Sequence, residues 1–415
     1  MSKITGLRCT SCKRVYSPDS GLFTCPVCGP YKGTLEVLYD YDAIGKKFNR
    51  KNWIVPELPG HYRYIKLLPF EDTKLIPPLL VGYTPLIKSE FFEKKYHIKG
   101  LYLKDDTREP TLSYKDRASS IAAIKAKEAN ANGIIVASTG NAASSMAGFG
   151  ASIGMPVYVL APRSIPEGKL LQLLLFNAKV ILIDGNYDTS FDLSLKVAEK
   201  TGLYLRSTAV NPYLSEGKKT AAFEIAEQLE YNMPSYVFVP VGDGCIIESV
   251  YKGFNELKRL GFIEKIPHMV GVQAEKSAPL VRAYENNTDE IEFIENPETV
   301  ADSINVGVPR DGVKALKSVK ESNGFFIGVS DEEILEAISE LAKYTGIFTE
   351  PAAGAAFAGF KKAIKENRIP HDATCVILLT GNGLKDPRAI KRIAKKDVPV
   401  VSKEDLDTIV DLIRF

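Results

Sequence analysis

The sequence contains no long apolar run and no excess of charge of either sign. Its 53 Lys and Arg residues nearly balance 51 Asp and Glu residues, and the basic residues are scattered, so no basic patch predicts binding to nucleic acid or to an anionic membrane. No apolar stretch approaches the ~18 residues that span a bilayer, and the N-terminal segment MSKITGLRCT lacks the apolar core of a signal peptide. We therefore expect a cytoplasmic protein without nucleic-acid or membrane partners.

Histidine is also scarce. The four histidines form no H-x-x-x-H pair and lie near no G-x-S-x-G motif, which disfavours histidine-based metal sites and the serine hydrolases. These residues are His61, His97, His268 and His371. With 415 residues, of which 45% are hydrophobic, the chain has room for two or three domains.

Four of the six cysteines form a C-x2-C-x12-C-x2-C pattern within the first thirty residues. Two such pairs on short hairpins place four thiolates at the corners of a tetrahedron, which is typical of a structural zinc ribbon. The expected ligands are Cys9, Cys12, Cys25 and Cys28. The alternative is a ribbon whose cysteines bind no metal or pair on oxidation. We expect Cys245 and Cys375 to be packing residues.

From about residue 100, short apolar segments alternate with longer helical ones. Segments such as GIIVAS, PVYVLA and KVILID predict strands, and the segments between them have helical character. This alternation predicts an α/β protein with crossover connections and two parallel sheets.

The stretch PTLSYKDRAS (110–119) places a lysine at the start of a predicted helix. Ser113 suits the N-cap, Asp116 lies three residues later as in a capping box, and the helix is expected to continue to Gly133. Lys115 then falls in the first turn, where the helix dipole disfavours a cation. That position and partial burial would lower the pKa of its amine and make it a better nucleophile. The alternative is a solvated helix residue.

Three predicted junctions between strands and following segments also carry polar groups. Ser138, Thr139, Gly140 and Asn141 precede a small-residue helix, Gly242 to Ile246 form a glycine-rich turn, and Thr380 ends an apolar strand. Singly, each is consistent with an N-cap, a steric turn or a satisfied strand end. Together with Lys115 they suit a carbonyl cofactor with a phosphate tail, pyridoxal phosphate (PLP). The glycine turn would hold the phosphate, Asn141 the ring hydroxyl and Thr380 the ring nitrogen.

The chain resembles the threonine synthases and, more broadly, the tryptophan-synthase-β class of PLP enzymes called fold type II. The carrying motifs, in the family's order, are GYTPL (82–86), PTLSYKDRAS (110–119), STGNAASSMAGFGASIGMP (138–156), EGKKTAAFEIAEQL (216–229), PVGDGC (240–245) with YKGF (251–254), VSDEEILEA (329–337) with LAKYTGIFTEPAAGAAFAG (341–359), and LTGNGLKDP (379–387).

The resemblance implies two three-layer αβα domains and a homodimer. We expect a ribbon-like segment at 1–40, a large PLP domain at 41–105 with 215–400, a small domain at 106–214 and a C-terminal helix at 401–415. It implies that Lys115 binds PLP covalently and that the cofactor contacts are Asn141, Gly242, Asp243, Gly244, Cys245, Ile246 and Thr380. The substrate-binding residues would be Ser113, Ser138, Thr139, Gly140 and Lys218.

The family's reaction converts O-phosphohomoserine and water into threonine and phosphate, with the freed lysine as general base. A neutral hydroxyl at the ring nitrogen favours elimination and replacement. This sequence departs from the family at four positions. Leu214 stands where the family often has an arginine associated with the leaving phosphate, and Lys218, which could supply that charge, replaces a glutamine. Leu112 replaces a glycine and Asp243 an asparagine.

Two other functions are weighed against threonine synthesis. One is a related PLP enzyme of β-replacement or β-elimination, such as a cysteate-synthase-like enzyme acting on O-phosphoserine, or a threonine or serine dehydratase. The other is a zinc-ribbon nucleic-acid-binding or scaffold protein that keeps an enzyme fold, which the near-neutral charge and the presence of Lys115 disfavour.

Overall fold

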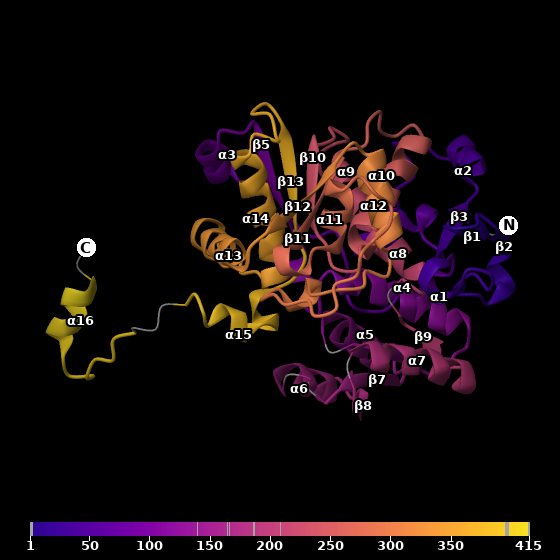
Figure 1. Ribbon diagram of the computed structural model, residues 1–415, viewed down its shortest axis with the longest axis horizontal. Coiled ribbons are helices and arrows are strands. Elements are labelled where there is room, and N and C mark those ends of the chain that lie inside the picture. Colours follow the sequence, from indigo (N-terminus) through magenta and orange to yellow (C-terminus); the bar gives the residue numbers. More distant parts are fainter. Residues whose placement is uncertain are drawn as a thin grey trace.

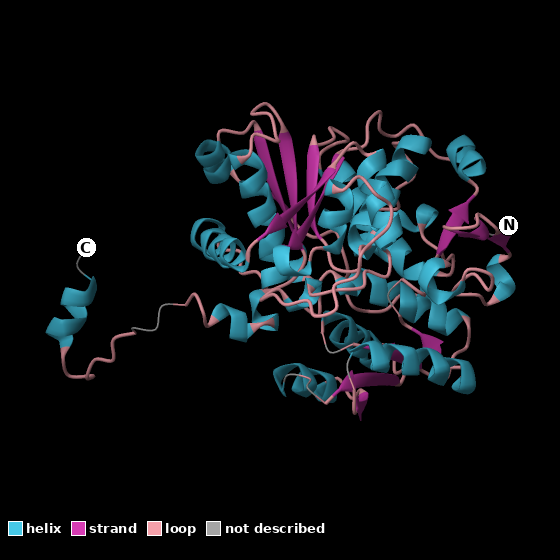
Figure 2. Ribbon diagram, viewed as in Figure 1, coloured by secondary structure: helices cyan, strands magenta, loops and turns pink. Residues whose placement is uncertain are grey.

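The computed structural model describes residues 3–138, 140–163, 165, 167–185, 187–207, 209–394 and 398–413. Within them the chain forms three sheets (Figures 1 and 2). The strands are β1 (Ile4–Cys9), β2 (Val15–Tyr16), β3 (Leu35–Tyr39), β4 (Leu86–Lys88), β5 (Gly100–Asp105), β6 (Ile134–Ala137), β7 (Val157–Pro162), β8 (Lys179–Ile183), β9 (Tyr204–Leu205), β10 (Tyr236–Pro240), β11 (His268–Ala274), β12 (Phe325–Val329) and β13 (Thr374–Leu379).

The helices connect and cover these sheets. They are α1 (Gly29–Lys32), α2 (Tyr41–Lys47), α3 (Glu90–Tyr96), α4 (Lys115–Glu128), α5 (Asn141–Ser152), α6 (Glu167–Leu175), α7 (Tyr187–Thr201), α8 (Tyr213–Lys218), α9 (Thr220–Gln228), α10 (Cys245–Arg259), α11 (Pro279–Glu285), α12 (Gly312–Glu321), α13 (Asp331–Thr345), α14 (Pro351–Lys365), α15 (Pro387–Ile390) and α16 (Leu406–Ile413). Among the described residues, no helix combines the length and apolar character needed to cross a membrane.

The largest sheet has the strand order β12-β11-β10-β13-β5-β4, with β4 as an antiparallel edge. Side chains of β10 alternate between two cores: Val237 and Val239 pack with α9, α10 and α12, whereas Phe238 packs with α13 and α14. Helices therefore cover both faces of this sheet, as its nearly continuous apolar strands require. The predicted α/β fold with parallel sheets is confirmed.

The second parallel sheet has the order β8-β7-β6-β9, and its helices α5, α6 and α7 follow its strands in sequence (Figure 1). The predicted domain boundaries assign this sheet to the small domain, and those boundaries stay a prediction. The helix α16 has no buried residue and lies apart from the rest of the chain in Figure 1.

The N-terminal sheet β2-β1-β3 is antiparallel and packs against the α9–α10 side of the large sheet. Polar contacts reinforce this packing. Tyr39 donates to Glu216 across 2.7 Å and Tyr41 donates to Glu256 across 2.8 Å, all within the protein interior. The ribbon is thereby joined to α8 and α10.

Candidate active site

One cavity lies at the carboxyl ends of the large sheet, between the loops that follow β10 and β13. The strand order changes direction at this pair, since β11 and β12 extend to one side and β5 to the other. Parallel sheets bind ligands at such switch points. The cavity is lined by Tyr114, Lys115, Asn141, Lys218, Pro240, Val241, Gly242, Asp243, Gly244, Cys245, Ile246, Ser303, Ile304, Glu350, Ala352 and Thr380. Every predicted cofactor contact is therefore in one place.

Lys115 is the first residue of α4, but the predicted cap is wrong. Tyr114 occupies the N-cap with helical dihedral angles, and Ser113 makes no side-chain cap. The carboxylate of Asp116 instead accepts hydrogen bonds from the amide of Thr111 (2.6 Å) and its hydroxyl (2.5 Å). Asp116, which was predicted to form a capping box, therefore orders the loop that precedes α4 instead.

Tyr114 fixes the start of α4 between two other elements of the site. Its amide donates to the carbonyl oxygen of Thr380 across 2.9 Å, and its hydroxyl donates to the carbonyl oxygen of Lys218 across 2.5 Å. The helix ends at Glu128, before the expected Gly133, because Asn130 adopts a left-handed conformation with φ of 49°. Lys115 is therefore held in a fixed position relative to the loop after β13 and to the end of α8.

The amine of Lys115 has the altered acidity that its position predicted. Burial, together with the nearby cations Lys218 and Arg206, lowers its pKa from 10.5 to about 8. Because imine formation requires the neutral amine, this shift increases the reactive fraction near neutral pH.

A buried ionic network anchors α4 just beyond Lys115. The guanidinium of Arg117 is fully buried and pairs with Asp106 (2.6 Å), with Glu109 (3.4 Å) and with Glu224. Lys104 also pairs with Glu224 across 2.6 Å. Although burial alone would raise it, Arg117 and Lys104 hold the pKa of Glu224 below its usual range. The network ties α4 to α9 and to the end of β5.

The glycine-rich turn after β10 packs closely against the start of α12, so a side chain at Gly244 would clash with Ala315 and Asp311. Gly244 has φ of 92°, and a β-carbon there would lie 2.9 Å from the carbonyl oxygen of Asp311. The carboxylate of Asp243 accepts a hydrogen bond from the amide of Arg310 (3.3 Å), which holds it toward the α12 loop. The turn leads into α10, whose N-terminal amides suit an anion.

Asn141 and Glu350 form a polar pair in the cavity. The amide of Asn141 donates to both carboxylate oxygens of Glu350 at 3.0 Å and to the hydroxyl of Ser303 at 3.3 Å. Burial raises the pKa of Glu350. Sequence reasoning missed Glu350, Ser303 and Ile304; the only available signal was an acidic residue inside the apolar FTEPAAG segment.

The predicted substrate-binding residues are only partly gathered here. Lys218 lines the cavity, whereas Ser113, Ser138 and Gly140 do not. The Ser138 hydroxyl accepts from the amide of Gly140 (3.1 Å), and Ser113 forms a bridge with Gly381. Thr139 lies outside the described residues.

The cavity fits PLP on three counts. It holds a buried amine of lowered pKa, a glycine-rich turn at the N-terminus of α10, and the residue Thr380 with its hydroxyl group. Lys115 would bind the cofactor's aldehyde and residues 242–246 its phosphate.

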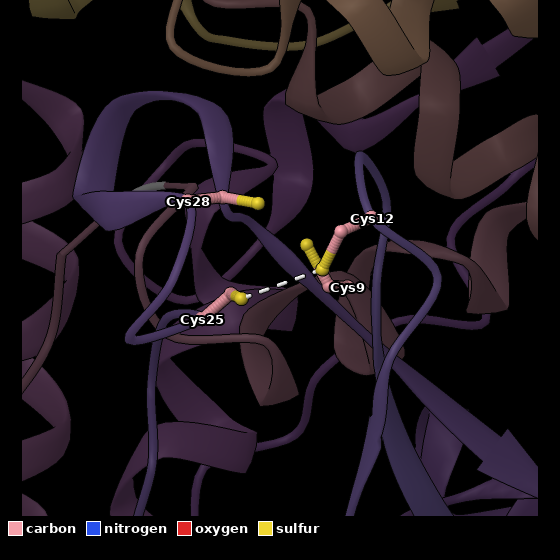
Figure 3. Close-up of side chains that lie close together, drawn as sticks. All are labelled: Cys9, Cys12, Cys25 and Cys28. Atoms are coloured by element: carbon pink, nitrogen blue, oxygen red, sulfur yellow. Dashed lines mark hydrogen bonds between the residues drawn. The ribbon is translucent and has the colours of Figure 1, made fainter.

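The four N-terminal cysteines form a separate candidate metal site (Figure 3). Their sulfur atoms all lie within 4.8 Å of one another, and those of Cys12 and Cys25 are 3.7 Å apart. A tetrahedral zinc ion with Zn–S bonds of about 2.3 Å requires sulfur separations of about 3.8 Å. At Gly33, a β-carbon would lie 2.8 Å from that of Cys25. This donor set fits zinc.

Comparison with known proteins agrees with the site. The family described as "Pyridoxal-phosphate dependent enzyme" matches residues 78–381. The chain is thus a PLP-dependent enzyme. A threonine synthase of Methanosarcina acetivorans is 39% identical, covering 98% of this chain and 98% of that protein. A threonine synthase of Methanocaldococcus jannaschii is 38% identical over 95% and 96%. The chain belongs to the threonine synthase family.

Solved structures show the same fold in more distant proteins. A threonine deaminase of Solanum lycopersicum superposes with a TM-score of 0.62 at 18% identity, covering 90% of this chain and 93% of that one. An L-serine ammonia-lyase of Rhizomucor miehei gives a TM-score of 0.65 at 19% identity, covering 76% and 98%. At these identities the likeness concerns the fold alone.

Proposed function

We propose that this protein is a PLP-dependent threonine synthase that converts O-phospho-L-homoserine and water into L-threonine and phosphate. The observation that carries the proposal is the convergence of Lys115, Asn141, the 242–246 turn and Thr380 on one cavity. The threonine synthases that match nearly the whole chain support the reaction. The alternative β-replacement and dehydratase activities have no comparable support.

PLP, when bound, supplies an electron sink for a carbanion at the substrate's α carbon. The residues of this chain hold and orient the reactants. Lys115 would bind the cofactor's aldehyde and, as a free amine, would move protons among the substrate carbons. The amides of the 242–246 turn bind the cofactor phosphate, and Thr380 presents a neutral hydroxyl to the ring nitrogen.

Asn141 is assigned to the cofactor's ring hydroxyl, and Glu350 is its positioning residue. The paired carboxylate contacts hold the Asn141 amide at the N-terminus of α5. That helix end, with Ser138, Thr139 and Gly140, is proposed to bind the substrate carboxylate, an anion that the helix dipole favours. Ser113 is proposed as a further substrate-binding residue.

We further propose that Cys9, Cys12, Cys25 and Cys28 bind a structural zinc ion and that the enzyme is a cytoplasmic homodimer. All four ligand positions of the zinc would be filled by sulfur, so it takes no part in the reaction. Its role is to hold the ribbon, which contacts α8 and α10 through Tyr39 and Tyr41.

A product assay tests the proposed reaction. The PLP-loaded enzyme is incubated separately with O-phosphohomoserine, O-phosphoserine, serine and threonine, and amino acids, oxo acids and phosphate are measured. We expect equal amounts of threonine and phosphate from O-phosphohomoserine. Pyruvate from serine or 2-oxobutanoate from threonine, without turnover of O-phosphohomoserine, would reject the proposal in favour of a dehydratase.

A further inference from the structure

Lys218 is a buried cation with which none of the described residues forms an ion pair. It is only 1% exposed and lines the cavity. Among the described residues, its ammonium group makes neither a hydrogen bond nor an ion pair; the contact from Tyr114 goes to its backbone carbonyl. A buried ammonium without a partner is strongly unfavourable, which is why buried charges are normally paired.

The two carboxylates of the cavity are directed to other groups. Asp243 accepts from the amide of Arg310, and Glu350 accepts from Asn141. The adjacent Lys219 is also buried, but its ammonium group is paired. It donates hydrogen bonds to the carboxylates of Glu216 and Glu256. The missing counter-ion of Lys218 must therefore be supplied by a ligand.

The surroundings of Lys218 indicate which ligand suits it. Burial lowers the pKa of Lys115 and raises that of Cys245, and the charge of Lys218 lowers both. Lys218 therefore lies close to the reactive amine and to the start of α10. A third cation, Arg206, donates to Ser119 at 3.2 Å, one helical turn along α4 from Lys115. Of these cations, Lys115 and Lys218 line the cavity, and two cations at one cavity favour a dianion such as a phosphate monoester.

The position of Lys218 on α8 explains a departure from the family. Leu214, where the family often has an arginine, is 1% exposed and packs in an apolar cluster with Ala118 and Ala122. It can offer no charge. Residues 214 and 218 are four apart in sequence, so they share one face of α8. Lys218, one turn further along this face, carries a charge and lines the cavity.

We propose that Lys218 is the counter-ion of a phosphate monoester bound in this cavity. Two ligands carry this group: the substrate, if the proposed function is correct, and the cofactor. Removing one charged contact from a buried phosphate is expected to weaken its binding about 10- to 100-fold.

The test compares Lys218→Gln and the charge-preserving Lys218→Arg with Lys219→Gln. Three quantities are measured: the Kd of PLP for the apoenzyme, the inhibition constant of inorganic phosphate for the holoenzyme and the KM for O-phosphohomoserine. Urea denaturation reports folding. Lys219→Gln should destabilise the fold, because it leaves Glu216 and Glu256 short of a cation, while keeping phosphate affinity. Lys218→Gln should not destabilise it.

Each outcome decides the proposal. If Lys218→Gln raises KM and the phosphate inhibition constant at least tenfold with the PLP Kd unchanged, and Lys218→Arg restores them, Lys218 binds the substrate's phosphate. If only the Kd of PLP rises, and the binding of unphosphorylated pyridoxal is unaffected, Lys218 binds the phosphate of the cofactor. If Lys218→Gln changes none of these constants, the proposal is wrong. Should the wild type fail to turn over O-phosphohomoserine, the proposed function fails, while the PLP and phosphate binding constants still test Lys218.

Discussion

The lowered pKa of Lys115 gives the most informative prediction. An amine of pKa about 8 is about one-tenth neutral at pH 7, whereas one of pKa 10.5 is neutral in roughly one molecule in three thousand. The site therefore raises the reactive fraction several-hundredfold. Since deprotonation makes the nucleophile, reactivity should increase with pH and level off above about pH 8.

Competitive acylation with acetic anhydride, followed by peptide mass spectrometry, measures this in the apoenzyme. The reaction of Lys115 is compared across pH with that of an exposed lysine, Lys258, in the same digest. Substituting Lys218→Gln removes one of the cations that disfavour protonation of Lys115, so the midpoint should move to higher pH. Binding of inorganic phosphate beside Lys218 should move it in the same direction.

Two results would refute this reasoning. One is a Lys115 reactivity that continues to rise past pH 10, as for an ordinary amine. The other is a midpoint that is the same in Lys218→Gln and the wild type, which would show that the charge of Lys218 does not lower the pKa of Lys115.

Three further predictions concern stability and ligand binding. Arg117→Ala should lower the free energy of unfolding by about 3–5 kcal/mol in urea denaturation, since it leaves buried carboxylates unpaired. Lys317→Ala, which removes a solvent-exposed pair with Glu321, should cost less than about 1 kcal/mol; equal losses would contradict the ascribed role of burial. Gly244→Ala should weaken PLP binding at least tenfold in a fluorescence titration. The reason is that left-handed dihedral angles cost a residue with a side chain about 1–2 kcal/mol before any steric clash. An unchanged Kd of PLP would argue against the turn as the phosphate site. Cys12→Ser should reduce the zinc content from one ion per chain to a small fraction of that by atomic emission, and full retention would remove this cysteine from the ligand set.

The sequence allowed much of the fold to be predicted because the relevant signals are local. Short apolar segments separated by helical ones define crossover units whatever their final packing. The 242–246 turn and Thr380 follow β10 and β13 of one parallel sheet, so they could be expected to meet at its carboxyl edge. Asn141 follows β6 of the second sheet, and only the chemistry of a carbonyl cofactor with a phosphate tail grouped it with them before the structure was known.

What the sequence did not reveal depends on contacts between distant segments. Ser113 and Asp116 have the spacing of a capping box. The Asp116 carboxylate instead accepts two hydrogen bonds from Thr111, so no capping box forms. Glu350 lies far from Asn141 in sequence, and only the packing of α5 against the loop before α14 brings the two together. Likewise, the sequence shows that Lys218 departs from the family pattern. It does not show that the Lys218 ammonium group has no anionic partner among the described residues.

The central claim is that the amine of Lys115 carries the cofactor, and borohydride reduction of the PLP-loaded enzyme followed by peptide mapping tests it most directly. We predict a single pyridoxyl adduct, on the peptide that contains Lys115, and loss of the cofactor's visible absorbance in Lys115→Ala. An adduct on another lysine, or none in a preparation that remains active, would contradict the account.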